Sequence, residues 1–307
     1  MRIKGVGIDA HSPRLDGSLE VLEHDLTLFQ RVGFDYVEIP VHGVDAILGG
    51  KLNERRVKEV QEILARFDLQ YTVHSPDPLN LCDVGGKPRC RLDLQKAVFR
   101  ASLEFTEAIG AEIMVYHGGA TNPPNNSDDE GADLSVERLK EVEREALSEL
   151  ADRAAAWGIV IGVENVGPKS YGARIAELVE QVREINHPNV GITLDFGHAY
   201  LTARHFGYDF LEAVELAAPY IVHTHVHDNF GRMVALPQDV PYIHTAPFGV
   251  NDMHLPPGWG EIPYQEVFSR LKDYQGVVLM ELKPRYSPYF EEALQETCRL
   301  LAESGVE

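Results

Sequence analysis

The stretch AIGAEIMVYHGG, residues 108–119, joins the end of a predicted helix to a predicted strand. Gly110 is typical of the residue that stops a helix, because glycine readily adopts the left-handed backbone conformation found there. The run EIMVYHG that follows is short and largely apolar, which is typical of a buried strand. His117 stands at its end, where the strand gives way to glycines. The stretch therefore predicts a helix, a strand and a polar strand end in close succession.

This order recurs along the chain, for instance in RVGFD at residues 31–35 and AWGIV at residues 156–160. Eight runs predict strands: IKGVGID (3–9), DYVEIP (35–40), QYTVHS (70–75), EIMVYHG (112–118), IVIGVEN (159–165), VGITLDFGH (190–198), YIVHTHVHD (220–228) and GVVLMELK (276–283). Eight amphipathic segments predict helices: 19–32, 53–67, 92–110, 135–157, 173–185, 207–218, 263–273 and 288–304.

Strand and helix units in this number and order, within 307 residues, predict an α/β fold, a single (β/α)8 TIM barrel. We expect it to form one domain over residues 1–307. An open, doubly wound sheet is the alternative, but no Gly-rich dinucleotide-binding fingerprint follows the first strand. Pro/Gly-rich insertions follow the fourth and seventh strands, at the strand ends where a barrel builds its site.

The composition is that of a soluble globular protein, with 44% hydrophobic and 25% charged residues. A formal net charge of −20 opposes binding to polyanions and favours divalent cations. Cys82, Cys90 and Cys298 are too few for a disulfide framework, so we expect a reducing, cytoplasmic environment. The sequence shows neither an export signal nor an apolar stretch of about 18 residues, and we expect no membrane partner.

Residues of metal-ligating type stand at the carboxyl ends of the predicted strands. They are His11, Glu38, His74, His117, Glu164, Asp195, His198, His225, His227 and Glu281. Because the strands of a closed barrel converge on one axis, these side chains should meet in a small volume. So many carboxylates and imidazoles are costly to bury together without a cation. A mixture of His, Asp and Glu without Cys favours Mn²⁺, Co²⁺, Mg²⁺, Zn²⁺ or Fe²⁺ and does not choose among them.

The remaining histidines receive other interpretations. His223 lies deeper in its strand than His225 and is predicted to be a hydrogen-bonded residue of the barrel interior. His227, at the rim with Asp228 and Asn229, is a candidate for supporting the ligands or facing substrate. The histidines outside the predicted strands are expected at the surface: His42, His187, His205 and His244.

Seven pieces of the sequence resemble the xylose-isomerase-like TIM-barrel superfamily. They are HSPDPLNL (74–81), VYHGG (115–119), VENVG (163–167), LDFGHAY (194–200), HVHDNFG (225–231), DMHLPPGWGEI (252–262) and MELK (280–283). The superfamily holds the sugar phosphate isomerases/epimerases, the ketose 3-epimerases and the endonuclease-IV-type AP endonucleases. The resemblance covers essentially the whole chain and does not single out one member.

The isomerase/epimerase branch implies four metal ligands, one from each of the last four strands: Glu164, Asp195, His225 and Glu281. It also implies substrate contacts from His198 and Arg232, although the spacing to Arg232 is one residue longer than in the epimerase pattern. From the residues themselves, Glu38 is a further candidate for substrate at the barrel mouth. Trp259 is another, because an aromatic ring in that loop could stack on a sugar.

The endonuclease-IV branch implies a larger ligand set that holds three zinc ions. Its additional positions match His74, His117, His198, Asp252 and His254, which are therefore candidates for further metal or substrate contacts. Such a nuclease also needs a DNA-binding surface. Lys87, Arg89 and Arg91 offer some basic character, but the insertion after the fourth strand contains SDDEGAD.

The sequence is best interpreted as a divalent-metal-dependent isomerase or epimerase of a ketose, a related polyol or a sugar phosphate. Glu164 and Glu281 are predicted to be the catalytic residues: one removes a proton and the other returns it, through a metal-stabilised enediolate. Two alternatives stay open, an AP endonuclease with three zinc ions and a non-catalytic barrel that binds metal or sugar. The acidic surface argues against a nucleic-acid partner without excluding one, and the resemblance is compatible with a homo-oligomer.

Overall fold

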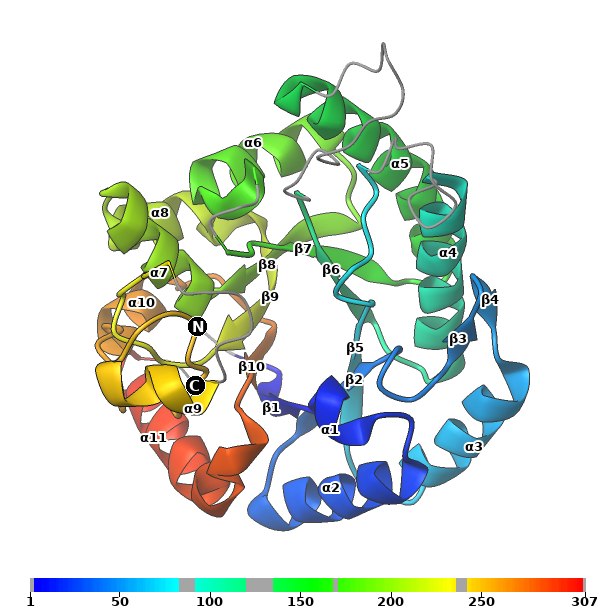
Figure 1. Cartoon of the computed structure of the whole chain (residues 1–307), viewed down its shortest axis with the longest axis horizontal. Helices are drawn as coiled ribbons and strands as arrows, with labels where there is room; N and C mark the ends of the chain where they lie inside the picture. The colour runs from blue at the N-terminus through cyan, green and yellow to red at the C-terminus, as the bar shows by residue number, and fades with distance from the viewer. Residues whose placement is uncertain (1–2, 83–91, 120–134, 168–170, 236–241, 306–307) are drawn as a thin grey trace.

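Eight parallel strands close into a barrel in the computed structural model, which describes residues 3–82, 92–119, 135–167, 171–235 and 242–305. Around the barrel the strand order is β1-β10-β9-β8-β7-β6-β5-β2, so the first and last strands pair and complete the ring (Figure 1). The barrel strands are β1 (Gly5–Asp9), β2 (Tyr36–Pro40), β5 (Gln70–His74), β6 (Ile113–His117), β7 (Val160–Glu164), β8 (Val190–Asp195), β9 (Ile221–Val226) and β10 (Val277–Met280).

Helices surround the barrel on its outer side (Figure 1). The α-helices are α1 (Ser12–Leu15), α2 (Leu19–Val32), α3 (Glu54–Leu64), α4 (Leu92–Ala108), α5 (Val136–Ala156), α6 (Ile175–Ile185), α7 (Phe196–Phe206), α8 (Phe210–Ala217), α9 (Tyr242–Thr245), α10 (Tyr264–Arg270) and α11 (Phe290–Glu303). Short 3-10 helices cover η2 (Tyr171–Ala173), η3 (Ala218–Tyr220), η4 (Ala246–Phe248) and η5 (Pro284–Tyr289), and a small antiparallel hairpin pairs β3 (Ile47–Leu48) with β4 (Lys51–Leu52). The predicted α/β barrel is confirmed.

Helix α2 illustrates how the sequence sets an element of the outer layer. The Ser18 hydroxyl accepts a hydrogen bond from the Val21 amide at the start of the helix. Gly33 ends it in the left-handed conformation, with φ at 103°. Leu22, Leu26 and Phe29 follow the helical repeat and are buried against the barrel. The main hydrophobic core therefore lies between the helices and the outer face of the strands.

The prediction of a strand over 190–198 is wrong at its end, because β8 stops at Asp195 and α7 begins at Phe196. The Asp195 carboxylate accepts a hydrogen bond from the His198 amide at 2.6 Å and so caps the helix. His198 therefore lies in the first turn of a helix, and Asp195 alone closes the strand.

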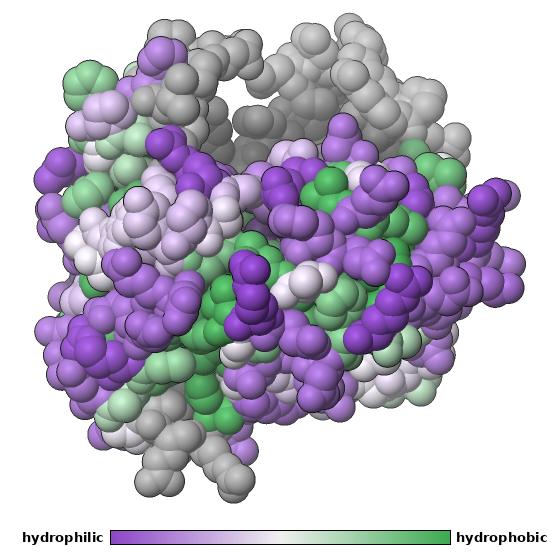
Figure 2. Space-filling model, turned by 90° about the horizontal axis from the view of Figure 1, so that it is seen from below, coloured by the Kyte–Doolittle hydropathy of each residue, from purple (hydrophilic) through white to green (hydrophobic). Residues whose placement is uncertain are grey.

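The surface carries mostly hydrophilic side chains on the side of the barrel that Figure 2 shows, with hydrophobic side chains exposed in a narrower area between them. Among the described residues, no helix combines the length and apolar character needed to cross a membrane.

Two neighbouring strands meet closely inside the barrel. Gly162 of β7 lies so near β8 that a Cβ atom there would clash with the Thr193 side chain, which is itself fully buried. The absent side chain leaves the room that Thr193 occupies.

Replacing Gly162 by alanine should destabilise the barrel by about 1–3 kcal/mol, because the added methyl overpacks its interior. Denaturant unfolding followed by circular dichroism measures the change. Gly167→Ala is a matched control in the loop after the same strand, because a Cβ there meets no atom within 4 Å. Equal stability of the two variants would contradict the packing argument.

Candidate metal centre and active site

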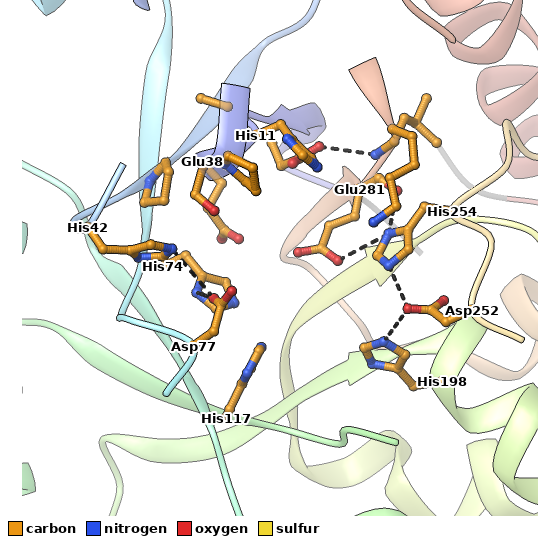
Figure 3. Close-up of a pocket in the computed structure, with 17 residues that line it drawn as sticks. His11, Glu38, His42, His74, Asp77, His117, His198, Asp252, His254 and Glu281 are labelled. Atoms are coloured by element: carbon orange, nitrogen blue, oxygen red, sulfur yellow. Dashed lines mark hydrogen bonds and ion pairs between the residues drawn. The ribbon is translucent and has the colours of Figure 1, made fainter. Parts of the chain in front are cut away.

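A cavity of about 270 Å³ opens at the carboxyl ends of the barrel strands (Figure 3). Its walls come from elements far apart in sequence. The lining residues are Asp9, Ala10, His11, Ser12, Pro13, Glu38, Pro40, His42, His74, Asp77, His117, His198, Asp252, His254, Glu281, Leu282 and Lys283. The cavity is therefore dominated by imidazoles and carboxylates, as the strand-end pattern predicted.

The four ligand candidates of the isomerase branch come together below this cavity. Each of Glu164, Asp195, His225 and Glu281 offers one ligand atom, and these atoms lie within 4.8 Å of one another. His225 Nδ1 is 3.2 Å from Glu164 Oε1 and 3.4 Å from Glu281 Oε1. Glu281 lines the cavity, whereas Glu164, Asp195 and His225 are almost completely buried beneath it.

Further histidines approach the same buried carboxylate of Glu164. His117 Nε2 lies 3.2 Å and His74 Nε2 3.4 Å from Glu164 Oε2. Neither approach has hydrogen-bond geometry, and Glu164 Oε2 is buried without a hydrogen bond. A buried carboxylate oxygen in this state is costly unless a cation or proton satisfies it.

A second group of donors surrounds Asp252. Asp252 Oδ2 is 2.7 Å from His254 Nε2 and 3.3 Å from His198 Nε2 (Figure 3). Asp252 Oδ1 is 3.7 Å from His227 Nε2. Oδ1 is buried and has no hydrogen bond. His254 holds a φ of 45°, in the left-handed region that non-glycine residues rarely adopt. Such backbone strain is typical of functional sites.

Asp228 fixes the loop that carries Asp252 and His254. Its Oδ1 accepts hydrogen bonds from the amides of Asn229 at 2.9 Å and Ile262 at 3.2 Å, and its Oδ2 accepts one from Gly258 at 2.9 Å. The backbones of Asp228 and Leu255 also exchange two hydrogen bonds. Asp228 therefore anchors the loop rather than facing substrate.

Replacing Asp228 by asparagine should loosen this loop, because an amide group cannot accept hydrogen bonds at both ends as the carboxylate does. Leaving a buried amide unpaired costs about 1–3 kcal/mol, so we expect lower stability and faster limited proteolysis within 252–262. Glu261→Gln is the control in the same loop, since Glu261 pairs with Arg232 at the surface. Unchanged proteolysis in the Asp228 variant would contradict an anchoring role.

Burial and neighbouring charges shift the pKa values in the cavity. Burial raises the pKa of Glu281 to about 7, and Glu164 and Asp195 add to the rise against the opposing effect of His225. Burial and the proximity of Glu281 raise the pKa of Asp9 to about 8. Burial alone would lower the pKa of His74, but the nearby carboxylates of Glu164 and Glu38 raise it to about 10. The site without a metal therefore retains protons at neutral pH.

These observations fit a divalent cation. The oxygen and nitrogen ligand atoms lie close enough to one another to bind the same cation. Two carboxylate oxygens, Glu164 Oε2 and Asp252 Oδ1, are also buried without hydrogen bonds. The donor set of carboxylates and imidazoles suits Mn²⁺, Co²⁺, Zn²⁺ or, through its carboxylates, Mg²⁺.

Residues 26–304 match the family described as xylose isomerase-like TIM barrel. The chain belongs to this family. A relative in sequence, an uncharacterized protein of Methanocaldococcus jannaschii, is 28% identical over 263 residues, which cover 83% of this chain and 79% of that protein.

Solved structures of the xylose isomerase-like family superpose over almost the whole chain. A D-tagatose 3-epimerase-like protein matches with a TM-score of 0.72 and 26% identity, over 97% of this chain and 99% of that chain. The IolI protein, solved with a zinc atom, matches with a TM-score of 0.67 and 20% identity, over 98% of this chain and 97% of that chain, and this likeness shows the fold alone. Several other matches are named as sugar epimerases, which are isomerase-class enzymes.

Two substrate candidates from the sequence, Arg232 and Trp259, are not among the described residues that line the cavity. Arg232 is half exposed and pairs with Glu261 at 3.2 Å. The Trp259 ring packs against Tyr286 and Tyr289, because its loop folds back over the start of α11. Their contact with substrate stays a prediction.

Other residues that line the cavity were not predicted from the sequence. His42 was expected at the surface but lines the cavity, as do Asp9, Asp77 and Lys283. Asp77 Oδ1 lies 3.6 Å from His74 Nδ1 and 3.7 Å from His42 Nε2. Asp9 and Lys283 could have been found from their positions, because Asp9 is the last residue of β1 and Lys283 closely follows β10. The basic residues Lys87, Arg89 and Arg91, the SDDEGAD segment and Cys90 lie outside the described residues.

Proposed function

We propose that this protein is a divalent-metal-dependent sugar isomerase or epimerase that acts on a ketose, a related polyol or a sugar phosphate. The observation that carries the proposal is the convergence of Glu164, Asp195, His225 and Glu281 beneath a cavity at the barrel mouth. The similarity to a D-tagatose 3-epimerase-like protein across nearly the whole chain supports it.

In this proposal the four residues hold the cation, and the substrate occupies the cavity above them. A bound divalent cation would polarise a carbonyl and a hydroxyl of the substrate and so stabilise negative charge that develops on it. Glu281 lines the cavity, where a bound substrate would meet its carboxylate, so it is the first proton-transfer residue in this scheme. Glu164 is the second proton-transfer residue in this scheme, and its Oε1, like that of Glu281, lies close to His225 Nδ1, at 3.2 and 3.4 Å.

The segments that follow the neighbouring strands β1 and β10 supply groups that bind hydroxyls. His11, Ser12 and Lys283 line the cavity there, and His11 Nδ1 is buried without a hydrogen bond. These groups are suited to orient a polyhydroxylated substrate.

A second candidate function is phosphodiester hydrolysis of the endonuclease-IV type. It is favoured by the approach of His74 and His117 to Glu164 and of His198 and His254 to Asp252, which provides donors for more than one cation. The net charge of −20 weighs against it, because a DNA-binding surface needs basic side chains.

Replacing Glu281 by glutamine should abolish turnover of the ketose while preserving the fold, since the amide cannot exchange the proton. Steady-state assays on a panel of ketoses and their phosphates measure kcat, and thermal unfolding checks the fold. Glu291→Gln on the surface of α11 is the control. Activity that survived the Glu281 change would overturn the two-glutamate mechanism.

Elemental analysis of the purified protein, together with an incision assay on abasic-site DNA, separates the two candidate functions. The epimerase proposal predicts about one tightly bound divalent metal per chain and no incision. About three zinc ions per chain with DNA incision would favour the nuclease instead.

Metal affinity should rise with pH between about 6 and 8, because protons compete with the cation for the ligands. Below its raised pKa of about 7 Glu281 holds a proton that must leave before the carboxylate can bind metal, and above that pKa this cost disappears. Calorimetric titrations in buffers of different ionisation enthalpy measure the proton release. In Glu281→Gln the release should become smaller, and an equal release in both proteins would contradict the assignment.

A further inference from the structure

Glu38, a substrate candidate from the sequence, lines the cavity, and its carboxylate also contacts side chains of the barrel interior. It lies in β2, is only 1% exposed, and its carboxylate reaches β5 and β9. Glu38 Oε2 accepts a hydrogen bond from Thr72 Oγ1 at 2.9 Å and lies 3.3 Å from His223 Nε2. Glu38 Oε1 lies 3.1 Å from His225 Nε2. Both of its oxygens are therefore surrounded by protein groups.

His225 stands between two sets of carboxylates. Its Nε2 faces Glu38, while its Nδ1 faces Glu164 and Glu281 at 3.2 and 3.4 Å. The imidazole is fully buried. One ring nitrogen therefore points toward the proposed ligand cluster, and the other points away from it.

The facing atoms Glu38 Oε1 and His225 Nε2 are both buried without a hydrogen bond, although only 3.1 Å separates them. Buried polar atoms almost always find a partner. A small rotation of the imidazole that aligned its Nε2–H with Glu38 Oε1 would satisfy both atoms at once.

We propose that Glu38 is a positioning residue: it accepts the Nε2–H of His225 and so leaves the Nδ1 lone pair directed at Glu164, Asp195 and Glu281. The inference rests on the proposed function, because it takes that cluster to be the cation site. A carboxylate behind a ligating histidine fixes the tautomer and ring orientation and raises the basicity of the ligating nitrogen.

Thr72 holds the Glu38 carboxylate in place, because it donates to one oxygen and leaves Oε1 for His225. His223 lies in the barrel interior, as predicted, but the predicted hydrogen bond is absent: neither of its ring nitrogens has a hydrogen-bond partner among the described residues. Its Nε2 approaches the same Glu38 oxygen as Thr72. The alternation of His223 and His225 along β9 thus places two imidazoles on either side of one carboxylate.

Substituting Glu38 by glutamine tests the proposal through metal affinity, measured by competition with a chromophoric chelator for Co²⁺ or Zn²⁺. We expect affinity to fall about 10- to 100-fold with the number of bound ions unchanged. Glu143→Gln is the matched control: Glu143 is an equally buried glutamate that accepts hydrogen bonds from Tyr116 and Gly119, away from the cluster, and its replacement should leave affinity unaltered.

Nitrogen-15 NMR of the imidazoles reports which ring nitrogen of His225 carries the proton. This preference would not change if Glu38 had only a structural role. In the wild-type protein His225 should carry its proton on Nε2, and in Glu38→Gln this preference should weaken. Thr72→Val, which removes the hydroxyl donor but keeps the carboxylate, should show a smaller loss of affinity and keeps the test available if the Glu38 variant does not fold.

The outcomes separate the two proposals. Failure of the wild-type protein to bind divalent metal would overturn the proposed function itself. If the wild-type protein binds metal and the Glu38 and Thr72 variants bind it with the same affinity, only the positioning role is overturned. Loss of a whole bound ion in Glu38→Gln would also overturn it, because Glu38 would then be a ligand in its own right, together with His223 and His225.

Discussion

The polar end of the barrel depends on charge compensation around Glu164. This buried carboxylate lies within 3.6 Å of ring nitrogens from His74, His117, His198 and His225, which come from four separate elements. The surrounding histidines hold the pKa of Glu164 well below its usual range despite burial. The negative charge of Glu164 is tolerated in the barrel interior only because these four imidazoles surround it.

Barrel geometry explains why the ligand candidates could be predicted from sequence. Strands that converge on one axis bring their last residues together, so Glu164, Asp195 and His225 needed only to stand at strand ends. The eight strands themselves followed from short apolar runs. Helix α7 was missed because LDFGH continues an apolar strand without a break. The cap made by the Asp195 side chain is a local hydrogen bond that apolar periodicity does not show.

Loop residues were less predictable, because a loop's path depends on contacts made far away. Arg232 was assigned from the family resemblance and Trp259 from its aromatic character, yet their side chains contact Glu261 and the residues just before α11. Glu38 was placed correctly at the barrel mouth, but its depth in the interior follows from Thr72 and His225, which lie far from it in sequence. The sequence thus predicted which strands carry polar residues better than which of those residues reach a ligand.

Asp195 connects the proposed metal ligands to the start of helix α7. One carboxylate oxygen holds the His198 amide at the start of α7, while the other faces His227 at 3.2 Å and His225 at 4.0 Å. Any change in charge on this carboxylate alters the strength of the hydrogen bond that begins the helix. We therefore expect a cation bound at the proposed site to change hydrogen exchange at the amides in the first turn of α7, even without a substrate.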